Sequence, residues 1–192
     1  MSSNKTGENI ANACRLISET CKNVEKLIAF LYEKAREDSE YIPHTLKPLC
    51  IRSDIAFNDE VIIMFQKKGE NESLYVVDIC LWENNASADV KDEAKIYISK
   101  FSYDRKLNLL KAPISKGSFW QFGDPLITGE IIELEITDEW YEGEVKEKDK
   151  ERANEDYRGL RSVIGFSIPL TSINVENAYK EIFGGFDKLA IK

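Results

Sequence analysis

The sequence predicts an α+β fold, in which a long N-terminal helix packs on a mostly antiparallel sheet of five or six strands and a short C-terminal helix follows. Three observations lead to this prediction. Apolar residues recur at helical spacing near the N-terminus, several middle segments alternate or run apolar as strands do, and residues 175–183 return to a helical pattern. A single domain, residues 1–192, is long enough to hold all of these elements around one core.

The long helix is predicted from Glu8 to Glu37, after a flexible leader formed by residues 1–7. Thr6 or Asn4 is the expected N-cap, because a short polar side chain accepts a hydrogen bond from a free backbone N–H of the first turn. The helix has apolar residues alternately four and three positions apart, which is the heptad spacing of a coiled-coil seam. These residues are Ile10, Cys14, Ile17, Cys21, Val24, Ile28, Leu31 and Ala35.

The length of this helix decides what we expect its seam to contact. A helix of about 30 residues is about 45 Å long, and a chain of this size forms a globule roughly 40 Å across. We therefore expect the whole seam to lie across the protein's own sheet. A second apolar stripe on the same helix, through Leu16, Leu27 and Phe30, cannot be covered by the same sheet face. This stripe is the predicted contact for a protein partner or a homodimer, unless the C-terminal helix covers it.

The strand predictions depend on apolar runs and on alternation. Residues 61–65 are continuously apolar, which is typical of a strand covered on both faces. Residues 131–137 alternate, with Ile132, Leu134 and Ile136 expected to face inward. In order, the predicted strands are 61–65, 74–82, 94–103, 107–112, 131–137 and 162–168. Residues 49–51 lie in a connector with room for one short edge strand.

Two further segments complete the chain. Residues 142–158 hold seven acidic and five basic residues, and they are predicted to form a charged arm or loop: a solvated helix, a hairpin arm or a disordered loop. The C-terminal helix is predicted from Val175 to Phe183, with Asn174 as its cap and Gly184-Gly185 as its end.

Composition excludes several classes of function. A formal net charge of −8 argues against nonspecific nucleic-acid binding and against an anionic membrane surface, since both need excess Lys and Arg. The first residues are polar and no apolar run approaches a membrane span, so we expect a soluble cytoplasmic protein. The four cysteines form no CxxC pair and only one histidine is present, so we expect buried, reduced thiols, no metal and no cofactor.

The best catalytic candidate is a group formed by Asp78, Glu93 and Lys95. Metal-dependent nucleases use two carboxylates to hold Mg²⁺ and a lysine to polarise the phosphate. The spacing here permits that arrangement, but acidic-x-Lys triplets are common in so charged a chain. We expect Asp78 to face solvent or to pair with a lysine across the sheet. His44 has no nucleophile in a recognisable motif beside it, so no catalytic residue is assigned.

Three aromatic residues, Phe119, Trp120 and Phe122, lie between Gly117 and Gly123. Large aromatics usually lie in the core, which is the favoured interpretation here; the alternative is that they are exposed, and exposed aromatics flanked by glycine make good anchors for a partner. They are retained as candidate partner-binding residues.

The function that these observations favour is a non-enzymatic interaction or regulatory protein that acts as part of a larger protein assembly. The alternative is a small-molecule sensor domain with a pocket between helix and sheet. The metal-dependent nuclease is a remote third hypothesis.

Overall fold

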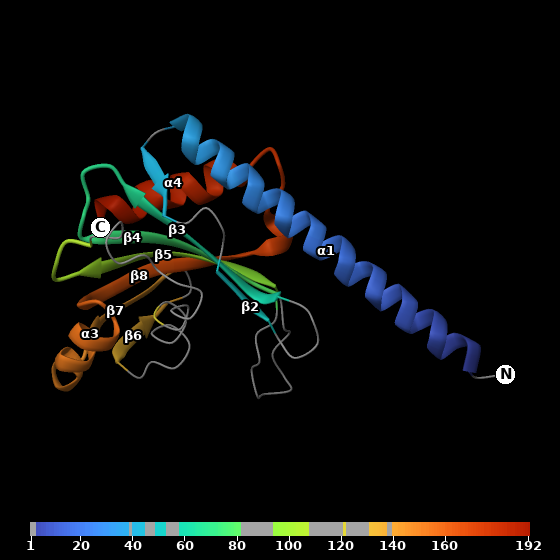
Figure 1. Ribbon diagram of the computed structural model, residues 1–192, viewed down its shortest axis with the longest axis horizontal. Helices are drawn as coiled ribbons and strands as arrows, with labels where there is room; N and C mark the ends of the chain where they lie inside the picture. Colours follow the sequence, from blue (N-terminus) through green and yellow to red (C-terminus); the bar gives the residue numbers. More distant parts are fainter. Residues whose placement is uncertain are drawn as a thin grey trace.

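The computed structural model describes residues 3–38, 40–44, 49–52, 58–81, 94–107, 121, 131–137 and 140–192. It confirms the α+β class: a long N-terminal helix, an antiparallel sheet and a shorter C-terminal helix (Figure 1). The helices are α1 (Ser3–Asp38), α3 (Lys150–Asp156) and α4 (Ala178–Ile191), with the 3-10 turns η2 (Glu147–Asp149) and η3 (Leu170–Ser172). The strands are β1 (Tyr41–Pro43), β2 (Leu49–Arg52), β3 (Asn58–Lys67), β4 (Ser73–Cys80), β5 (Lys95–Tyr103), β6 (Ile132–Ile136), β7 (Tyr141–Val145) and β8 (Leu160–Pro169).

The sheet is seven strand positions wide in the described residues, in the order β1-β3-β4-β5-β8-β7-β6, and β2 pairs with β3 beside β1. Every pair is antiparallel. The prediction of five or six strands was too low because it missed β1 and β7. Strand β1 ends at Pro43, which an edge strand tolerates, and β7 has only Tyr141 and Val145 as large apolar residues.

The central strands follow the predicted pattern closely. All five residues from Val61 to Phe65 are at most 2% exposed, so β3 is buried on both faces as its continuous apolar run predicts. The turn at residues 68–72 joins β3 to β4, and residue pairs such as Ile63–Val77 are in direct register. Strand β6 fits less well, because Ile132 is buried whereas Ile136 is 78% exposed at the edge of the sheet.

Each face of the sheet has its own hydrophobic core. The helix-side core lies under α1 and α4 and includes Tyr41, Phe65, Phe183 and Phe186, whose ring centroids lie 5.1–5.8 Å apart in the pairs that touch. The opposite core collects side chains from β3, β4, β5, β8, β7 and α3. Aromatic pairs at such distances add to the free energy gained by burial.

Helix α4 does not end at the glycine pair. It continues through Gly184 and Gly185 to Ile191, so the predicted end at these residues was wrong. A Cβ atom at Gly185 would lie 2.9 Å from the ring of Phe166 and 3.4 Å from Ile98, both on the sheet. Gly185 therefore lets the helix approach the sheet closely, and glycine here serves packing instead of termination.

Helix α1 begins at Ser3, so it includes residues 3–7 of the predicted leader, and neither Thr6 nor Asn4 is its N-cap.

The predicted charged arm, residues 142–158, is regular structure: most of β7, then η2 and α3. Ala153 and Tyr157 anchor α3 in the opposite core. Among the residues described, no helix is long and apolar enough to cross a membrane. Of the predicted strand 107–112, only Leu107 lies within the described ranges.

Candidate functional site

The most distinctive surface is the N-terminal half of α1. Figure 1 shows α1 running past the sheet, with its N-terminal end well away from the rest of the protein. On the seam, Val24, Leu31 and Ala35 are buried in the helix-side core. Toward the N-terminus the same seam emerges into solvent: Ile10 is 60% exposed and Cys14 is also exposed. We call residues 3–21 of α1 the arm and residues 22–38 the anchored half.

The seam residues of the arm are Ile10, Cys14, Ile17 and Cys21, and together we call them the free seam. Ile17 and Cys21 are half-buried. The expectation that the whole seam lies across the sheet is therefore wrong for this half. The helix has 36 residues, about 54 Å at the standard rise. Helix α4 already covers the centre of the same sheet face, so α1 packs on β1 and α4 at the margin.

The second predicted stripe does not form one surface. Leu16 is 62% exposed on the arm. Leu27 and Phe30 lie on the anchored half, where both are half-buried against the helix-side core. The Lys34 ammonium lies 5.9 Å from the centre of the Phe30 ring, so this ring already has a cation beside it.

The aromatic candidates Phe119, Trp120 and Phe122 lie outside the described residues. Gln121, between them, is described. Its amide nitrogen donates a hydrogen bond to the Asp156 carbonyl oxygen at 2.6 Å, and its amide oxygen accepts one from Arg158 Nε at 2.9 Å. Gln121 is therefore held at the C-terminal end of α3.

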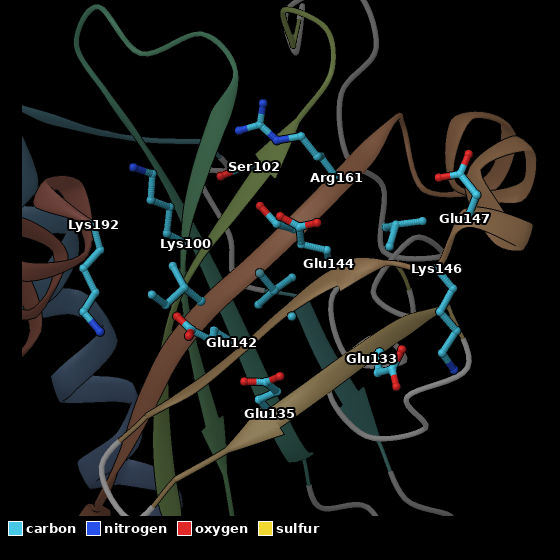
Figure 2. Close-up of a pocket in the computed structure, with 15 residues that line it drawn as sticks. Lys100, Ser102, Glu133, Glu135, Glu142, Glu144, Lys146, Glu147, Arg161 and Lys192 are labelled. Atoms are coloured by element: carbon cyan, nitrogen blue, oxygen red, sulfur yellow. The ribbon is translucent and has the colours of Figure 1, made fainter.

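A charged groove of about 830 Å³ lies on the helix side of the sheet, over β5, β8, β7 and β6. Figure 2 shows four glutamates in a band across β6 and β7, with Lys100 and Arg161 on the side of β5 and β8. The glutamates form two cross-strand pairs, Glu133–Glu144 and Glu135–Glu142. Among the described residues, no side-chain hydrogen bond or ion pair is made by the carboxylate of any of the four. Like charges directly opposite each other destabilise a strand pair.

Two of the groove's basic residues, Lys100 and Lys192, also contact groups outside the glutamate band. Lys100 Nζ is 3.5 Å from the Leu189 carbonyl oxygen and lies 5.9 Å from the centre of the Tyr75 ring. The ammonium of Lys192, at the end of α4, is 4.2 Å from the centre of the Trp140 ring. Within the described part of the chain, no group of three or more His, Cys, Asp and Glu side chains could hold a metal ion.

A row of polar side chains lies on the opposite face of the sheet. Asp78 is only 6% exposed, so the expected solvent-facing position was wrong. Ser99 Oγ and the Tyr141 hydroxyl share a buried hydrogen bond of 2.6 Å. Burial raises the pKa of Tyr141, and the nearby Asp78 carboxylate raises it further, so the phenol stays protonated. A Cβ atom at Gly165 would overlap the Tyr141 ring, and this glycine makes room for the contact.

The described residues do not test the nuclease group, because they include only two of its three members. Lys95 pairs with Cys80, and Asp78 pairs with Tyr97, so Asp78 and Lys95 lie on the same face of adjacent strands. Glu93 lies outside the described ranges.

The cysteines differ from the expectation of buried thiols. Cys14 is exposed, Cys21 and Cys80 are half-buried, and all three are free. Cys50 belongs to β2, but its side chain is not among those described. Two of the free thiols thus lie on the arm, seven residues apart on the free seam.

His44, the single histidine, lies directly after β1. Burial lowers its pKa below the ordinary value of 6.5, the positive charge of Arg158 lowers it further, and a hydrogen bond with Gln66 partly opposes this. The neutral imidazole is therefore the form that the folded protein favours.

Sequence analysis missed the glutamate band, the Ser99–Tyr141 hydrogen bond and the exposure of the free seam. The glutamates could have been found, because Glu142-Gly143-Glu144 repeats the alternation of Glu133-Leu134-Glu135. No local signal marks the other two, since both depend on which elements meet across the fold.

No protein-family model, no curated protein and no solved structure matches this chain. The functional argument therefore depends on the geometry described above.

Proposed function

We propose that this protein is a non-enzymatic interaction protein that joins a larger protein assembly through the arm of α1. The observation that carries the proposal is the division of one heptad seam. In the anchored half Val24, Leu31 and Ala35 are buried in the helix-side core, whereas in the arm Ile10 and Cys14 are exposed and Ile17 and Cys21 are only half-buried. Apolar residues at heptad spacing on a projecting helix are the pattern by which one helix recognises another helix or a groove.

Burial of the arm's apolar side chains by a partner would be favourable in free energy. Fully burying one isoleucine side chain contributes about 1.5–3 kcal/mol. Ile10, 60% exposed, and Ile17, half-buried, offer a partner the part of this free energy that their remaining exposure allows. Most of the stability of a helix in a protein comes from packing of its apolar face. Among the described residues, none of the arm belongs to the helix-side core, so a partner would supply both contact and stability.

The small-molecule sensor has weaker support. Ligand pockets are mainly apolar with a few polar groups. The described groove is lined largely by charged residues, and it lies on the sheet beyond α4 instead of between helix and sheet. Between the sheet and α4, the space is filled by rings such as Phe65, Phe183 and Phe186.

A cytoplasmic location is part of the proposal. Cys14, Cys21 and Cys80 are all free thiols, which is the usual state of cysteine in a reducing compartment.

Affinity purification tests the proposal. The chain, tagged at its C-terminus, would be purified from native lysate beside the variant Ile17→Asp, and Leu16→Asp would serve as the matched control. Both substitutions add one charge to the arm, but only Ile17 belongs to the free seam. We expect a stoichiometric protein, a second copy included, with the wild type and with Leu16→Asp and not with Ile17→Asp. Identical recovery from all three would contradict the proposal.

A further inference from the structure

We propose that the partner of the free seam is a second copy of this chain, and that the two arms pack antiparallel to each other. The inference rests on the proposed function, because it names the partner of the same surface. Four features support it: the residues beside the seam, the position of the body (the sheet with α3 and α4, described between residues 40 and 192), the seam layers and the charge distribution.

The residues beside the seam suit a symmetric pair. In the heptad, the flanking positions that face a partner helix are occupied by Ala11, Ala13, Ser18 and Thr20, all small and uncharged. The charged residues of the arm lie at other heptad positions: Lys5, Glu8, Arg15 and Glu19. Flanking charges normally decide which coiled-coil partners attract or repel each other. Two copies of this arm therefore meet without opposing like charges, as a two-fold interface requires.

The position of the body selects the antiparallel orientation. The seam of the anchored half faces its own body, through Val24, Leu31 and Ala35. In a parallel pair in register, the anchored halves would also have to face each other across this seam, where each body already lies. In an antiparallel pair the two anchored halves do not face each other: residues 10–21 of the two copies lie against each other, residues 3–9 of each copy reach past Cys21 alongside the anchored half of the other, and the bodies lie at opposite ends.

In the antiparallel pair, all layers of the seam also have a similar side-chain volume. When the arms run in opposite directions about a centre between Arg15 and Leu16, Ile10 meets Cys21 of the second copy, and Cys14 meets Ile17 of the second copy. Each of the four layers then combines one large and one small side chain. A parallel pair would instead alternate Ile–Ile and Cys–Cys layers of unequal volume, and uneven layers pack less well.

Charge favours the same orientation. The arm holds two acidic and two basic residues, so the formal net charge of −8 lies entirely outside it. Charges farther apart than the Debye length of about 8 Å at physiological salt are largely screened. An overlap of about 12 residues spans about 18 Å, and antiparallel arms thus keep the two acidic bodies apart.

The association state of the purified chain is the first test. Sedimentation of the full chain with reductant, from about 1 µM to about 1 mM, covers the range expected for so short an interface. We expect the mass to rise from 22.0 kDa toward twice that value. Ile17→Asp should stay monomeric with an unchanged unfolding midpoint of the body, and Leu16→Asp should still dimerise.

Disulfide cross-linking tests the orientation. In the antiparallel pair no cysteine of the wild type faces another cysteine, whereas Ile17→Cys places a thiol opposite Cys14 of the second copy. Mild oxidation should link the Ile17→Cys variant at least about tenfold faster than the wild type, and adding Cys14→Ser should abolish the gain. Rapid linking of the wild type would indicate a parallel pair, with Cys14 facing Cys14, and would overturn the proposed orientation.

The two proposals fail in different ways. A wild-type chain that stays monomeric at every concentration overturns the dimer. The proposed function would still stand if a different protein co-purified in stoichiometric amount with the wild type and not with Ile17→Asp. If Ile17→Asp changed neither self-association nor co-purification, both proposals would be overturned.

Discussion

The anchored half and the arm of α1 share one heptad seam, but only the anchored half has a core to bury it in. Leu31 is fully buried, whereas Ile10, three heptads earlier at the same seam position, is 60% exposed. Periodicity in the sequence states which side chains share a face of the helix. It does not state which elements cover that face, here β1, which follows α1 directly, and α4 at the other end of the chain.

The largest expected difference between the two halves of α1 comes from replacing one leucine in each half by alanine and comparing the free energies of unfolding. Leu31→Ala removes a fully buried side chain and leaves a cavity, so we expect the free energy of unfolding to fall by about 3 kcal/mol. Leu16→Ala, at a residue that is 62% exposed, should change it by less than about 0.5 kcal/mol. Denaturant unfolding of the two variants measures both. Equal losses would mean that the arm is packed in solution.

Replacing one exposed alanine by glycine in each half compares how strongly the helical backbone of that half is coupled to the rest of the fold. Ala29 and Ala11 are both exposed, so neither change removes packing. Glycine inside a helix costs about 1 kcal/mol relative to alanine. We expect Ala29→Gly to lower the global free energy of unfolding by about that amount, because the anchored half unfolds with the body.

Ala11→Gly should instead reduce helical circular dichroism and leave the unfolding midpoint of the body unchanged, since the arm frays locally. The circular dichroism and the unfolding midpoint should be measured at concentrations at which the chain is monomeric. A lower midpoint for Ala11→Gly would show that arm and body unfold together.

The smallest expected effect concerns pH, and it falls on the body alone. The pKa of His44 is lowered in the folded state, so the unfolded chain takes up the proton first. The contribution of His44 is therefore complete above about pH 6.5 and is lost as pH falls below that value toward the folded pKa. Between about pH 7.5 and 5.5, the wild type should lose more stability than His44→Asn.

The arm contains no histidine, so dimerisation should stay constant over the same pH window. Sedimentation at both pH values checks this. Loss of the dimer at the lower pH would indicate that the body takes part in the interface.

Much of the fold could be predicted from local pattern. The apolar run at residues 61–65 predicts a strand buried on both faces, and β3 is such a strand. Short elements were harder. Strand β1 has three residues and ends in Pro43, and β7 places Gly143 between two glutamates, so neither shows a clear apolar alternation. Both strands are stabilised by pairing with β3 or β8, which no local window reveals.

The glycine pair of α4 illustrates a different limit. Glycine ends many helices because it adopts positive φ without strain, and that rule predicted an end at Gly184-Gly185. The structure uses Gly185 for contact with Phe166 and Ile98, which are distant in sequence. The candidate surface shows the same limit: the seam residues were found from spacing, but the exposure of Ile10 and Cys14 depends on where α4 lies.

The glutamate pairs of β6 and β7 have a consequence for behaviour at high concentration. Strand β6 is the last strand of the sheet in the part of the chain that the structure describes, and the backbone groups of an edge strand can pair with another strand. A second molecule approaching this edge in antiparallel register would bring Glu133 and Glu135 beside their own counterparts, on a hairpin that already carries Glu142 and Glu144. The same repulsion between glutamates that destabilises this hairpin therefore opposes edge-to-edge aggregation. Added salt screens the repulsion, so it should stabilise the hairpin and also make aggregation through this edge easier.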